Sequence, residues 1–293
     1  MNFHKLGCPN SHCSNTEYFK KDGHYFRRND SRLVQRYQCL SCFKKFSNST
    51  SQLEYRQQKR RVNHPLLKLF VSGVSQRRAA LLININKNTV ARKFDYLARK
   101  YSAKNQAWLK NKEKHQITHV QFDDLVTIEH TKLKPLTVTS VVDTNSLQIL
   151  SAKVGQIPSF GLVAKLSRDK YGKRVNEHPR CLSEAFDEIK DIVHPKALFE
   201  SDEHYSYPPV VKAFFPEAIH IAYKGGRGCI TGQGELKKLG FDPLFAINHT
   251  YAMFRANINR LVRRTWCTTK KAEKLQQHLD LYVWFHNQVL RAC

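Results

Sequence analysis

Residues 117–124 read ITHVQFDD, a run of alternating apolar and polar side chains that ends in two acids. Alternation with a period of two predicts a β-strand with one buried face. Two further apolar runs follow, at 136–142 and 147–154, and the residues between them (143–146, DTNS) are typical of a hairpin turn. The pattern therefore predicts three antiparallel strands joined by short turns.

The sequence that follows alternates between helical and short apolar segments. We expect helices over 180–192 and 208–215 and short strands at 197–199 and 218–222. The strand at 197–199 runs into Glu-Ser-Asp-Glu, which places Asp202 at its end. Three antiparallel strands, a helix and a strand that ends in an acid follow the order of an RNase H-like α/β core, so we expect a mixed five-stranded sheet. Two long helical patterns, at 247–264 and 271–290, complete the chain.

Asp123 and Asp202 are the expected catalytic pair. In such a core, an acid in the middle of the first strand and an acid at the end of the fourth lie side by side. Neighbouring carboxylates repel each other unless a cation lies between them, and Mg²⁺ prefers oxygen ligands of this kind. We expect the two residues to bind Mg²⁺ or Mn²⁺, as two ions about 4 Å apart that promote phosphodiester cleavage. Taken singly, either acid could equally be an ordinary turn or helix-cap residue.

Four of the eight cysteines lie in the first 42 residues, as Cys8 and Cys13 and then Cys39 and Cys42. Two short loops that each present two thiolates can complete a tetrahedral zinc shell, and a segment this small needs metal to fold. We predict a zinc ribbon over 1–50 with one structural Zn²⁺, in which Gly23 forms a turn and Phe43 and Phe46 pack beneath the second loop. His12 in place of Cys13, or four unrelated buried thiols, are the alternatives. The remaining four cysteines show no ligand spacing.

Residues 51–105 are expected to form a helix-turn-helix domain. Leu66, Leu67, Phe70 and Val71 mark a first helix that Gly73 ends, Ser75 can cap a second helix, and Asn86 or Asn88 can cap a third. The start of the last helix of this motif enters the major groove of DNA. The expected DNA contacts on it are Lys87, Asn88, Thr89, Arg92 and Lys93. A plain three-helix bundle is the alternative. Residues 106–293 then form the catalytic domain, which makes the chain a multidomain α+β protein.

Charge favours nucleic acid as the partner. The chain carries 49 basic and 24 acidic side chains, a formal excess of +25, and residues 1–115 hold 25 of the basic and only 6 of the acidic ones. Such an excess repels itself and is usually tolerated where the partner is a polyanion. No apolar run approaches the ~18 residues of a membrane span, and the first residues lack the apolar segment of a secretory signal. We expect a cytoplasmic, nucleoid-associated protein with no membrane partner.

Taken together, these segments resemble a family. The cysteine ribbon, residues 120–125 and 200–202, and above all the stretch from Asn248 to Asn287 are similar to bacterial insertion-sequence transposases of the DDE superfamily that carry a zinc ribbon and a helix-turn-helix before an RNase H-like core. The resemblance covers nearly the whole chain. It implies that Asn248 is the third metal-ligating residue, since the matching position opens the helix seven residues before the arginine that matches Arg255.

The third position departs from the common pattern of the family. Most members have Glu there and some have Asn, so the resemblance implies a D-D-N triad of Asp123, Asp202 and Asn248. An amide oxygen can coordinate Mg²⁺ but adds no charge, which predicts weaker binding of the second ion. His249 and Glu235 are the rivals, although imidazole suits Mg²⁺ poorly and Glu235 lies in a glycine-rich loop. Arg255, Arg263 and Arg264 are further candidates for contacts with DNA phosphates.

The resemblance implies a transposase that binds the terminal inverted repeats of an insertion sequence, cleaves a DNA strand and transfers the new 3′-OH to target DNA. Its partners would be double-stranded DNA, as element ends and as target, and further copies of the chain in a homo-oligomeric complex. The main alternative is a catalytically inactive, transposase-derived DNA-binding regulator. A nuclease that acts on RNA through the same core is less favoured, because a helix-turn-helix suits duplex DNA.

Overall fold

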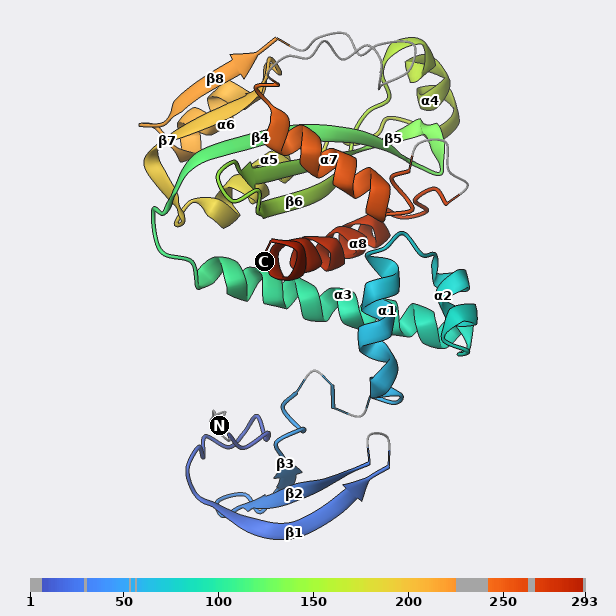
Figure 1. The fold of residues 1–293 in the computed structure, drawn as a ribbon, viewed down its shortest axis with the longest axis vertical. Coiled ribbons are helices and arrows are strands. Elements are labelled where there is room, and N and C mark those ends of the chain that lie inside the picture. Colours follow the sequence, from blue (N-terminus) through green and yellow to red (C-terminus); the bar gives the residue numbers. More distant parts are fainter. Residues whose placement is uncertain are drawn as a thin grey trace. The chain divides into compact units, whose positions relative to one another are not determined.

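The structure, a computed structural model, describes residues 7–28, 31–52, 54–55, 57–224, 242–262 and 267–291. The chain divides into two compact units, Met1–Leu66 and Leu67–Cys293, and each is described by itself (Figure 1). The described residues form an α+β protein with a five-stranded mixed sheet, as the sequence predicts.

The N-terminal unit contains a three-stranded antiparallel sheet in the order β1-β2-β3. Its strands are β1 (Phe19–Arg27), β2 (Arg32–Cys39) and β3 (Lys45–Ser47), and a 3₁₀ turn, η1 (Arg60–Val62), follows. Phe46 is buried, and its ring packs against Phe19 at 5.2 Å and Tyr37 at 6.0 Å between centroids. Phe43 was expected beside it, but its side chain is 68% exposed. Its backbone has a φ of 58° at the turn after Cys42, which directs the ring away from the core.

Gly23 does not form the turn that the sequence predicts. It lies inside β1, where Asp22 and Gly23 together oppose the single residue Arg36 of β2, and its φ is +68°. An extra residue in one strand makes a β-bulge, and glycine adopts the left-handed conformation there without strain. Side chains of β2 stabilise the bulge, because Gln35 donates to the Gly23 carbonyl at 2.8 Å and Arg36 to that of Asp22 at 3.1 Å.

Three helices follow, α1 (Asn63–Phe70), α2 (Gln76–Leu82) and α3 (Lys87–Lys110). The starts of α2 and α3 are capped at residues that the sequence predicts. The Ser75 hydroxyl accepts from the Arg78 amide at 3.3 Å, and Asn86 rather than Asn88 caps α3, with its oxygen 2.8 Å from the Asn88 amide. Each cap satisfies one backbone N–H that the helix itself leaves unpaired, worth about 1 kcal/mol.

Helix α3 is longer than expected and joins the helices to the sheet. It ends at Lys110, so the domain boundary expected at residue 105 falls inside it, and Leu67–Cys293 forms one compact unit. Its partner is α8 (Ala272–Phe285): Asp95 pairs with Lys274 at 2.5 Å and Asn105 donates to the Asp280 carbonyl at 2.9 Å.

The large sheet has the order β6-β5-β4-β7-β8. Its strands are β4 (Ile117–Glu129), β5 (Thr131–Asp143), β6 (Ile149–Gln156), β7 (Val193–Asp202) and β8 (Ile219–Tyr223). The first three are antiparallel in a meander, whereas β7 and β8 run parallel to β4. The turn between β5 and β6 is the predicted hairpin, in which Asp143 accepts from the Asn145 amide at 3.1 Å.

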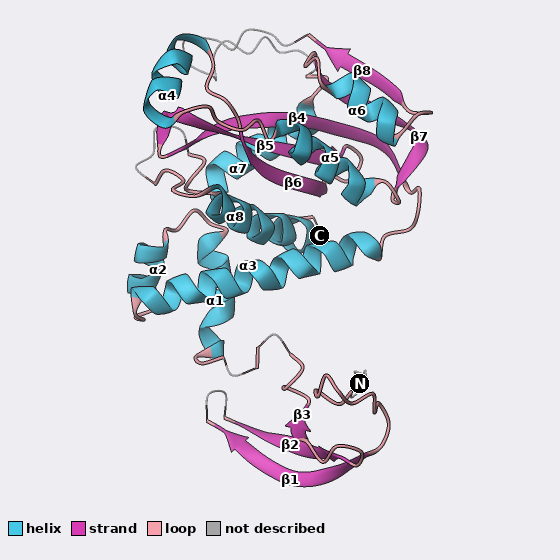
Figure 2. Cartoon of the chain, turned by 180° about the vertical axis from the view of Figure 1, so that it is seen from behind, coloured by secondary structure: helices cyan, strands magenta, loops and turns pink. Residues whose placement is uncertain are grey.

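Helices cover both faces of this sheet (Figures 1 and 2). On one face α5 (His178–Ile189) and α6 (Tyr207–Phe214) enclose an aromatic core in which Phe122 contacts Phe186 at 5.1 Å and Tyr207 at 4.9 Å. On the other face lies α7 (Phe245–Asn257), which ends before the Arg264 expected from the sequence. Helix α4 (Ala164–Tyr171), between β6 and α5, was not predicted.

Side chains from the C-terminal segment cover the outer edge of β6. Gln276 accepts from the Val154 amide and donates to the Ala152 carbonyl, both at 2.9 Å. Asn287, in the π-helical turn His286–Leu290, makes the same pair of bonds with the backbone of Ile149 at 2.9 and 2.8 Å. An open strand edge invites pairing with other chains, so these two amides close the edge that β6 would otherwise offer.

Candidate functional site

Asp123 and Asp202 lie on the two neighbouring parallel strands at the centre of the large sheet. Strand β4 pairs with β7 in a register that sets Gln121 opposite Glu200, two residues before each acid. Because side chains two residues apart in a strand share a face, the pairs Gln121–Glu200 and Asp123–Asp202 lie one after the other along the same face. The two acids that the sequence selects are thus brought together from positions 79 residues apart (202 − 123).

The electrostatics of the pair favour a cation. Burial raises the pKa of Asp123 to about 7, and the negative charges of Asp202 and Asp124 add to that shift. Among the residues that the structure describes, no basic side chain forms an ion pair with Asp123 or Asp202. Two carboxylates without a basic partner are the donor set that a hard divalent cation prefers. The residues present therefore fit Mg²⁺ or Mn²⁺.

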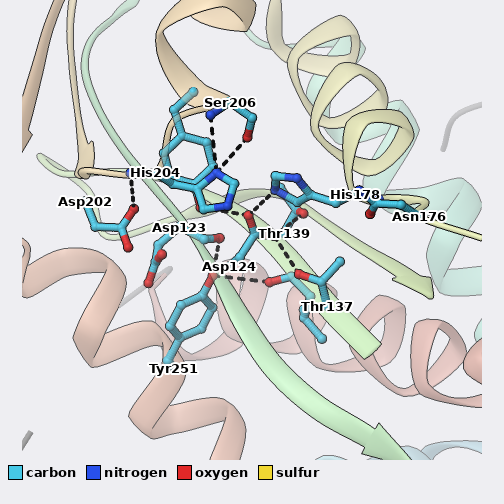
Figure 3. A network of polar contacts seen from close by, with 12 residues as sticks. Asp123, Asp124, Thr137, Thr139, Asn176, His178, Asp202, His204, Ser206 and Tyr251 are labelled. Atoms are coloured by element: carbon cyan, nitrogen blue, oxygen red, sulfur yellow. Dashed lines mark hydrogen bonds and ion pairs between the residues drawn. The ribbon is translucent and has the colours of Figure 1, made fainter. Parts of the chain in front are cut away.

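The neighbouring Asp124 has a different, enclosed environment on the opposite face (Figure 3). Its carboxylate lies 2.5 Å from His178 Nε2 and accepts from the Tyr207 hydroxyl and the Thr137 hydroxyl, both at 2.7 Å. Thr139 donates to it as well. Burial alone would raise the pKa of Asp124, but these donors and the His178 ring lower it below the ordinary value. The pKa of His178 is raised by the same contact.

Asp124 thereby fastens β4 to three other elements. The threonines come from β5, His178 from the first turn of α5 and Tyr207 from the first turn of α6. Asp124 directly follows Asp123 in the sequence, but its role was not predicted. Its partners lie between 13 and 83 residues away along the chain. The arrangement makes Asp124 a structural anchor for the strand that carries Asp123.

A second polar cluster joins the sheet to the start of α7. The buried Gln121 amide donates to Glu200 at 2.8 Å and to the Pro243 carbonyl at 2.6 Å, and its oxygen accepts from the Ile247 amide at 3.2 Å. Burial would raise the pKa of Glu200, but hydrogen bonds from Gln121, Tyr223 and His119 lower it. This cluster fixes where α7 begins relative to β4 and β7.

Asn248 lies in the first turn of that helix, and its side chain is exposed. Its amide nitrogen donates to Asp242 Oδ2 at 3.0 Å, which leaves the side-chain oxygen as the atom that can ligate a cation. One turn further on, the Tyr251 hydroxyl donates to the backbone carbonyl of Asp123 and, at 3.2 Å, to that of Val138. Tyr251 thus ties the helix of Asn248 to the strand of Asp123.

Asp242 is a residue that the sequence reasoning missed. Its other oxygen accepts from the Leu244 amide at 3.0 Å, so it shapes the turn before α7 while it holds the Asn248 amide. No signal in the sequence identifies this contact, because Asp242 lies before α7 and its partner Asn248 is six residues further along the chain.

The two rivals of Asn248 have different outcomes. His249 stacks on Phe245 at 5.7 Å, and burial together with the positive charge of Arg291 lowers its pKa. A ring beside an arginine is a poor place to receive a metal cation. Glu235 lies outside the described residues, so its candidacy stays a prediction.

The four N-terminal cysteines converge. Their sulfur atoms all lie within 4.8 Å of one another, with 3.4 Å between Cys8 and Cys42 and 3.8 Å between Cys13 and Cys39. Within the described part of the chain, this is the one group of three or more histidine, cysteine or acidic ligands that could hold a metal. His12 is exposed and stands outside the group. Four convergent thiols fit zinc, which they would hold in a closed, structural shell.

Backbone and side-chain donors shape this cluster. The Asn15 amide donates to Cys39 Sγ at 3.2 Å, while the Cys8 and Cys13 amides donate to the carbonyls of Asn15 and Asn10. Burial raises the pKa of Cys8 to about 12, whereas hydrogen bonds outweigh burial at Cys39 and lower its pKa to about 6.

The predicted DNA contacts on α3 divide into two groups. Lys87, Asn88 and Arg92 are exposed and Thr89 is half-buried, so the start of the helix presents them together. Lys93 is only 5% exposed, which contradicts its assignment as a DNA contact. The reason is that Lys93 lies on the buried side of α3, three residues after Val90 and four before Leu97, both of which are buried.

The remaining basic candidates lie near the C-terminus. Arg255 is half-buried in the last turn of α7, two turns after Asn248 and on the same side of the helix. Arg263 and Arg264 lie outside the described residues.

No protein-family model matches this sequence, and a search of curated proteins found no significant match. In the described part of the chain, every helix is too short or too polar to cross a membrane.

Proposed function

We propose that this protein is a DNA transposase whose active site is the carboxylate pair Asp123–Asp202 with Asn248 as the third ligand. The observation that carries the proposal is the placement of two acids without basic partners on adjacent parallel strands, in a position where burial and mutual repulsion raise the pKa of Asp123. Perturbed acids of this kind cluster at functional sites.

The topology of the sheet supports the choice of reaction. A three-stranded meander followed by two parallel strands in the order β6-β5-β4-β7-β8 is the order that we expect of an RNase H-like core, and it supports the proposal. In this reading Asp123 lies midway along the first strand of the core and Asp202 ends the fourth. Nucleotidyl transfer on DNA is the reaction class that suits such a site.

Asp123, Asp202 and the Asn248 oxygen would hold Mg²⁺ or Mn²⁺. When bound, the metal would supply Lewis-acid activation of the attacking oxygen and charge neutralisation at the scissile phosphate. The chain itself orients the ligands: Tyr251 fixes α7 on the carbonyl of Asp123, Asp242 turns the Asn248 amide, and Asp124 secures β4. In the overall reaction water first releases a 3′-OH at the element end, and this hydroxyl then displaces a target 3′-oxygen from its phosphate.

Two N-terminal elements would bind the DNA. The zinc ribbon and the exposed start of α3, with Lys87, Asn88 and Arg92, would bind the inverted repeats at the element ends. Joining two ends in one reaction calls for at least two copies of the chain on the DNA. The setting is the bacterial cytoplasm, with the protein bound to the nucleoid.

A DNA-binding regulator without catalytic activity is the second candidate. The observation that favours it is the neutral side chain at position 248, since an amide adds no charge to the two carboxylates. Both candidates bind the element ends, and only the transposase cleaves them.

The experiment that separates them is cleavage of labelled DNA from the sequences flanking the gene, with Mg²⁺ or Mn²⁺. We expect wild type to nick this DNA and Asp202→Ala and Asn248→Ala to lose the activity, each by more than about 100-fold, because even changes outside the metal shell typically cost 10–100-fold. Cleavage that survives Asn248→Ala would move the third role to Glu235 or His249. Tight end binding without any cleavage by wild type would favour the regulator.

A further inference from the structure

The N-terminal unit contains an open cleft of about 850 Å³ at the tip of the β1–β2 hairpin. The hairpin supplies one wall, and the segment around η1 supplies the other. Its lining is dominated by basic side chains: Arg27, Arg28, Arg32, Lys59, Arg60 and Arg61. Glu54 is the one acid among the described residues that line it.

Most of this charge is not neutralised within the described part of the unit. Arg28, Arg32, Lys59 and Arg61 form no ion pair or side-chain hydrogen bond with another described residue, and all four are exposed. The charges also act on the half-buried Tyr25, whose pKa is lowered by hydrogen bonds with Ser49 and Ser47 and further by the charges of Arg27 and Arg60. The cleft is therefore a concentrated positive site.

The backbone holds these charges together against their repulsion. Arg27 and Arg32 are direct cross-strand partners at the end of the hairpin, where like charges opposite each other are destabilising. On the other wall, Lys59 has a left-handed backbone with a φ of 50°, and Arg60 donates to the Glu54 carbonyl at 2.5 Å. A fold that keeps an unfavourable pair beside a strained residue indicates a ligand that offsets the cost.

We infer that this cleft, which we call the arginine cleft, binds the phosphodiester backbone of duplex DNA as a second contact surface besides α3. Guanidinium groups present forked donors that match phosphate oxygens, and five of the six basic side chains are arginines. Six positive charges around one open cleft exceed what a single phosphate group neutralises, whereas a DNA strand offers successive phosphates. That the polyanion is DNA rests on the proposed function.

We assign the contact to the backbone and not to base edges, because several positive charges around one cleft suit successive phosphates, and base edges carry no charge. Backbone contacts position a protein on the duplex, and base contacts specify the sequence. The arginine cleft therefore adds affinity for any duplex and leaves sequence preference to the start of α3.

The test measures DNA binding by the full-length, zinc-loaded chain, by fluorescence anisotropy with a 30-bp duplex from ~50 to ~250 mM NaCl. The cleft variant is Arg28→Gln/Arg32→Gln/Arg61→Gln. The matched control is Lys110→Gln/Lys114→Gln/Lys196→Gln, which removes the same charge. These exposed lysines lie near the starts of β4 and β7, away from Asp123 and Asp202. Zinc content and circular dichroism confirm that both variants are folded.

We expect the cleft variant to lower the slope of log K against log [NaCl] by about 3, since each phosphate contact contributes about 0.9. The control should change it by less than about 1. The cleft variant should lower the affinity for end DNA and for unrelated duplex by the same factor. Asn88→Ala should instead change the ratio of these two affinities. Equal effects of the cleft variant and the control would overturn the inference, because net charge would then explain the loss.

Two further outcomes would also contradict it. In the cleft variant, binding of duplex DNA could be unchanged while binding of a structured RNA of equal length is lost, or binding of duplex DNA could be unchanged while binding of inorganic phosphate at millimolar concentration is lost. The first would assign the cleft to RNA and the second to a small anion. The outcome is independent of catalysis: if the wild type never cleaves DNA yet the slope falls by about 3, the proposed function fails and the arginine cleft stands.

Discussion

Asp123 and Asp202 occupy neighbouring parallel strands, and the charge of Asp202 adds to the burial that raises the pKa of Asp123 to about 7. Neither acid pairs with a basic side chain in the described part of the chain. Asp124, one residue along, is instead surrounded by four donors. Adjacent acids in one strand therefore have different environments: Asp124 is held by four donors, whereas Asp123 has no basic partner among the described residues.

The first prediction concerns divalent metal and stability. Removing one of two repelling carboxylates should stabilise the metal-free protein, so Asp123→Asn should raise the melting temperature at pH 8 in EDTA. Addition of 10 mM MgCl₂ should then raise the melting temperature of wild type but not of the variant, since binding to the native state alone stabilises it. Differential scanning calorimetry measures both effects. An equal response of wild type and variant to Mg²⁺ would be inconsistent with ligation by Asp123.

The second prediction tests Asp124 as an anchor. Asp124→Ala leaves the hydroxyls of Thr137, Thr139 and Tyr207 and the His178 ring without their shared acceptor. Breaking a buried, hydrogen-bonded ion pair typically costs 3–5 kcal/mol, so we expect a loss of about that size in the free energy of unfolding. Urea denaturation measures it. Asp169→Ala, an exposed acid on α4, is the matched control and should change stability by less than about 0.5 kcal/mol.

The third prediction is a pH dependence that arises at His278. This ring is buried between Phe70 and Phe94 and accepts from Arg260 at 2.9 Å, and burial followed by the charge of Arg260 lowers its pKa to about 3. The unfolded chain binds a proton at this residue below pH about 6.5 while the folded protein does not. The contribution of neutral, buried His278 to the free energy of unfolding is therefore fully present above pH 6.5, and it is lost as the pH falls toward 3.

His278→Gln keeps an acceptor for Arg260 and removes the titration. Between pH 7 and pH 4.5 we expect wild type to lose roughly 2–3 kcal/mol more stability than this variant, at about 1.4 kcal/mol per pH unit. Comparing the two proteins cancels the contributions of other groups. Parallel pH profiles for wild type and variant would show that His278 is protonated in the folded state.

The fourth prediction concerns the cysteine cluster. Cys39→Ser should abolish stoichiometric zinc binding and unfold the N-terminal unit, because a small unit of this kind depends on metal for its stability. The unit Leu67–Cys293 should keep its protection from hydrogen exchange. Zinc content by mass spectrometry and exchange rates measure the two effects. His12→Ala and Cys267→Ser, whose side chains lie outside the cluster, should retain one zinc per chain.

Local patterns made much of this structure predictable. The spacing of Cys8, Cys13, Cys39 and Cys42 identifies the convergent thiols, and the caps at Ser75 and Asn86 are set by residues next to each other in the chain. The alternation of apolar and polar residues predicts strands of the large sheet. The positions of Asp123 and Asp202 within those strands predict that the two acids lie on neighbouring strands.

Features set by distant contacts were not predictable. The partners of Asp124 come from three separate elements. The burial of Lys93 depends on which side of α3 faces the interior of the folded unit. Gly23 is required by a bulge that appears only when β1 and β2 are in register. The arginine cleft likewise needs the hairpin and the η1 segment to meet in space.

The central claim is that Asp202 ligates a catalytic metal, and metal rescue tests it most directly. Asp202→Cys replaces an oxygen ligand with sulfur, which Mg²⁺ accepts poorly and softer ions accept better. We predict that cleavage of end DNA by this variant is lost in Mg²⁺ and is restored at least about 10-fold in Mn²⁺, while Asp169→Cys cleaves like wild type in both ions. Equal activity of Asp202→Cys and wild type in Mg²⁺ would contradict the account.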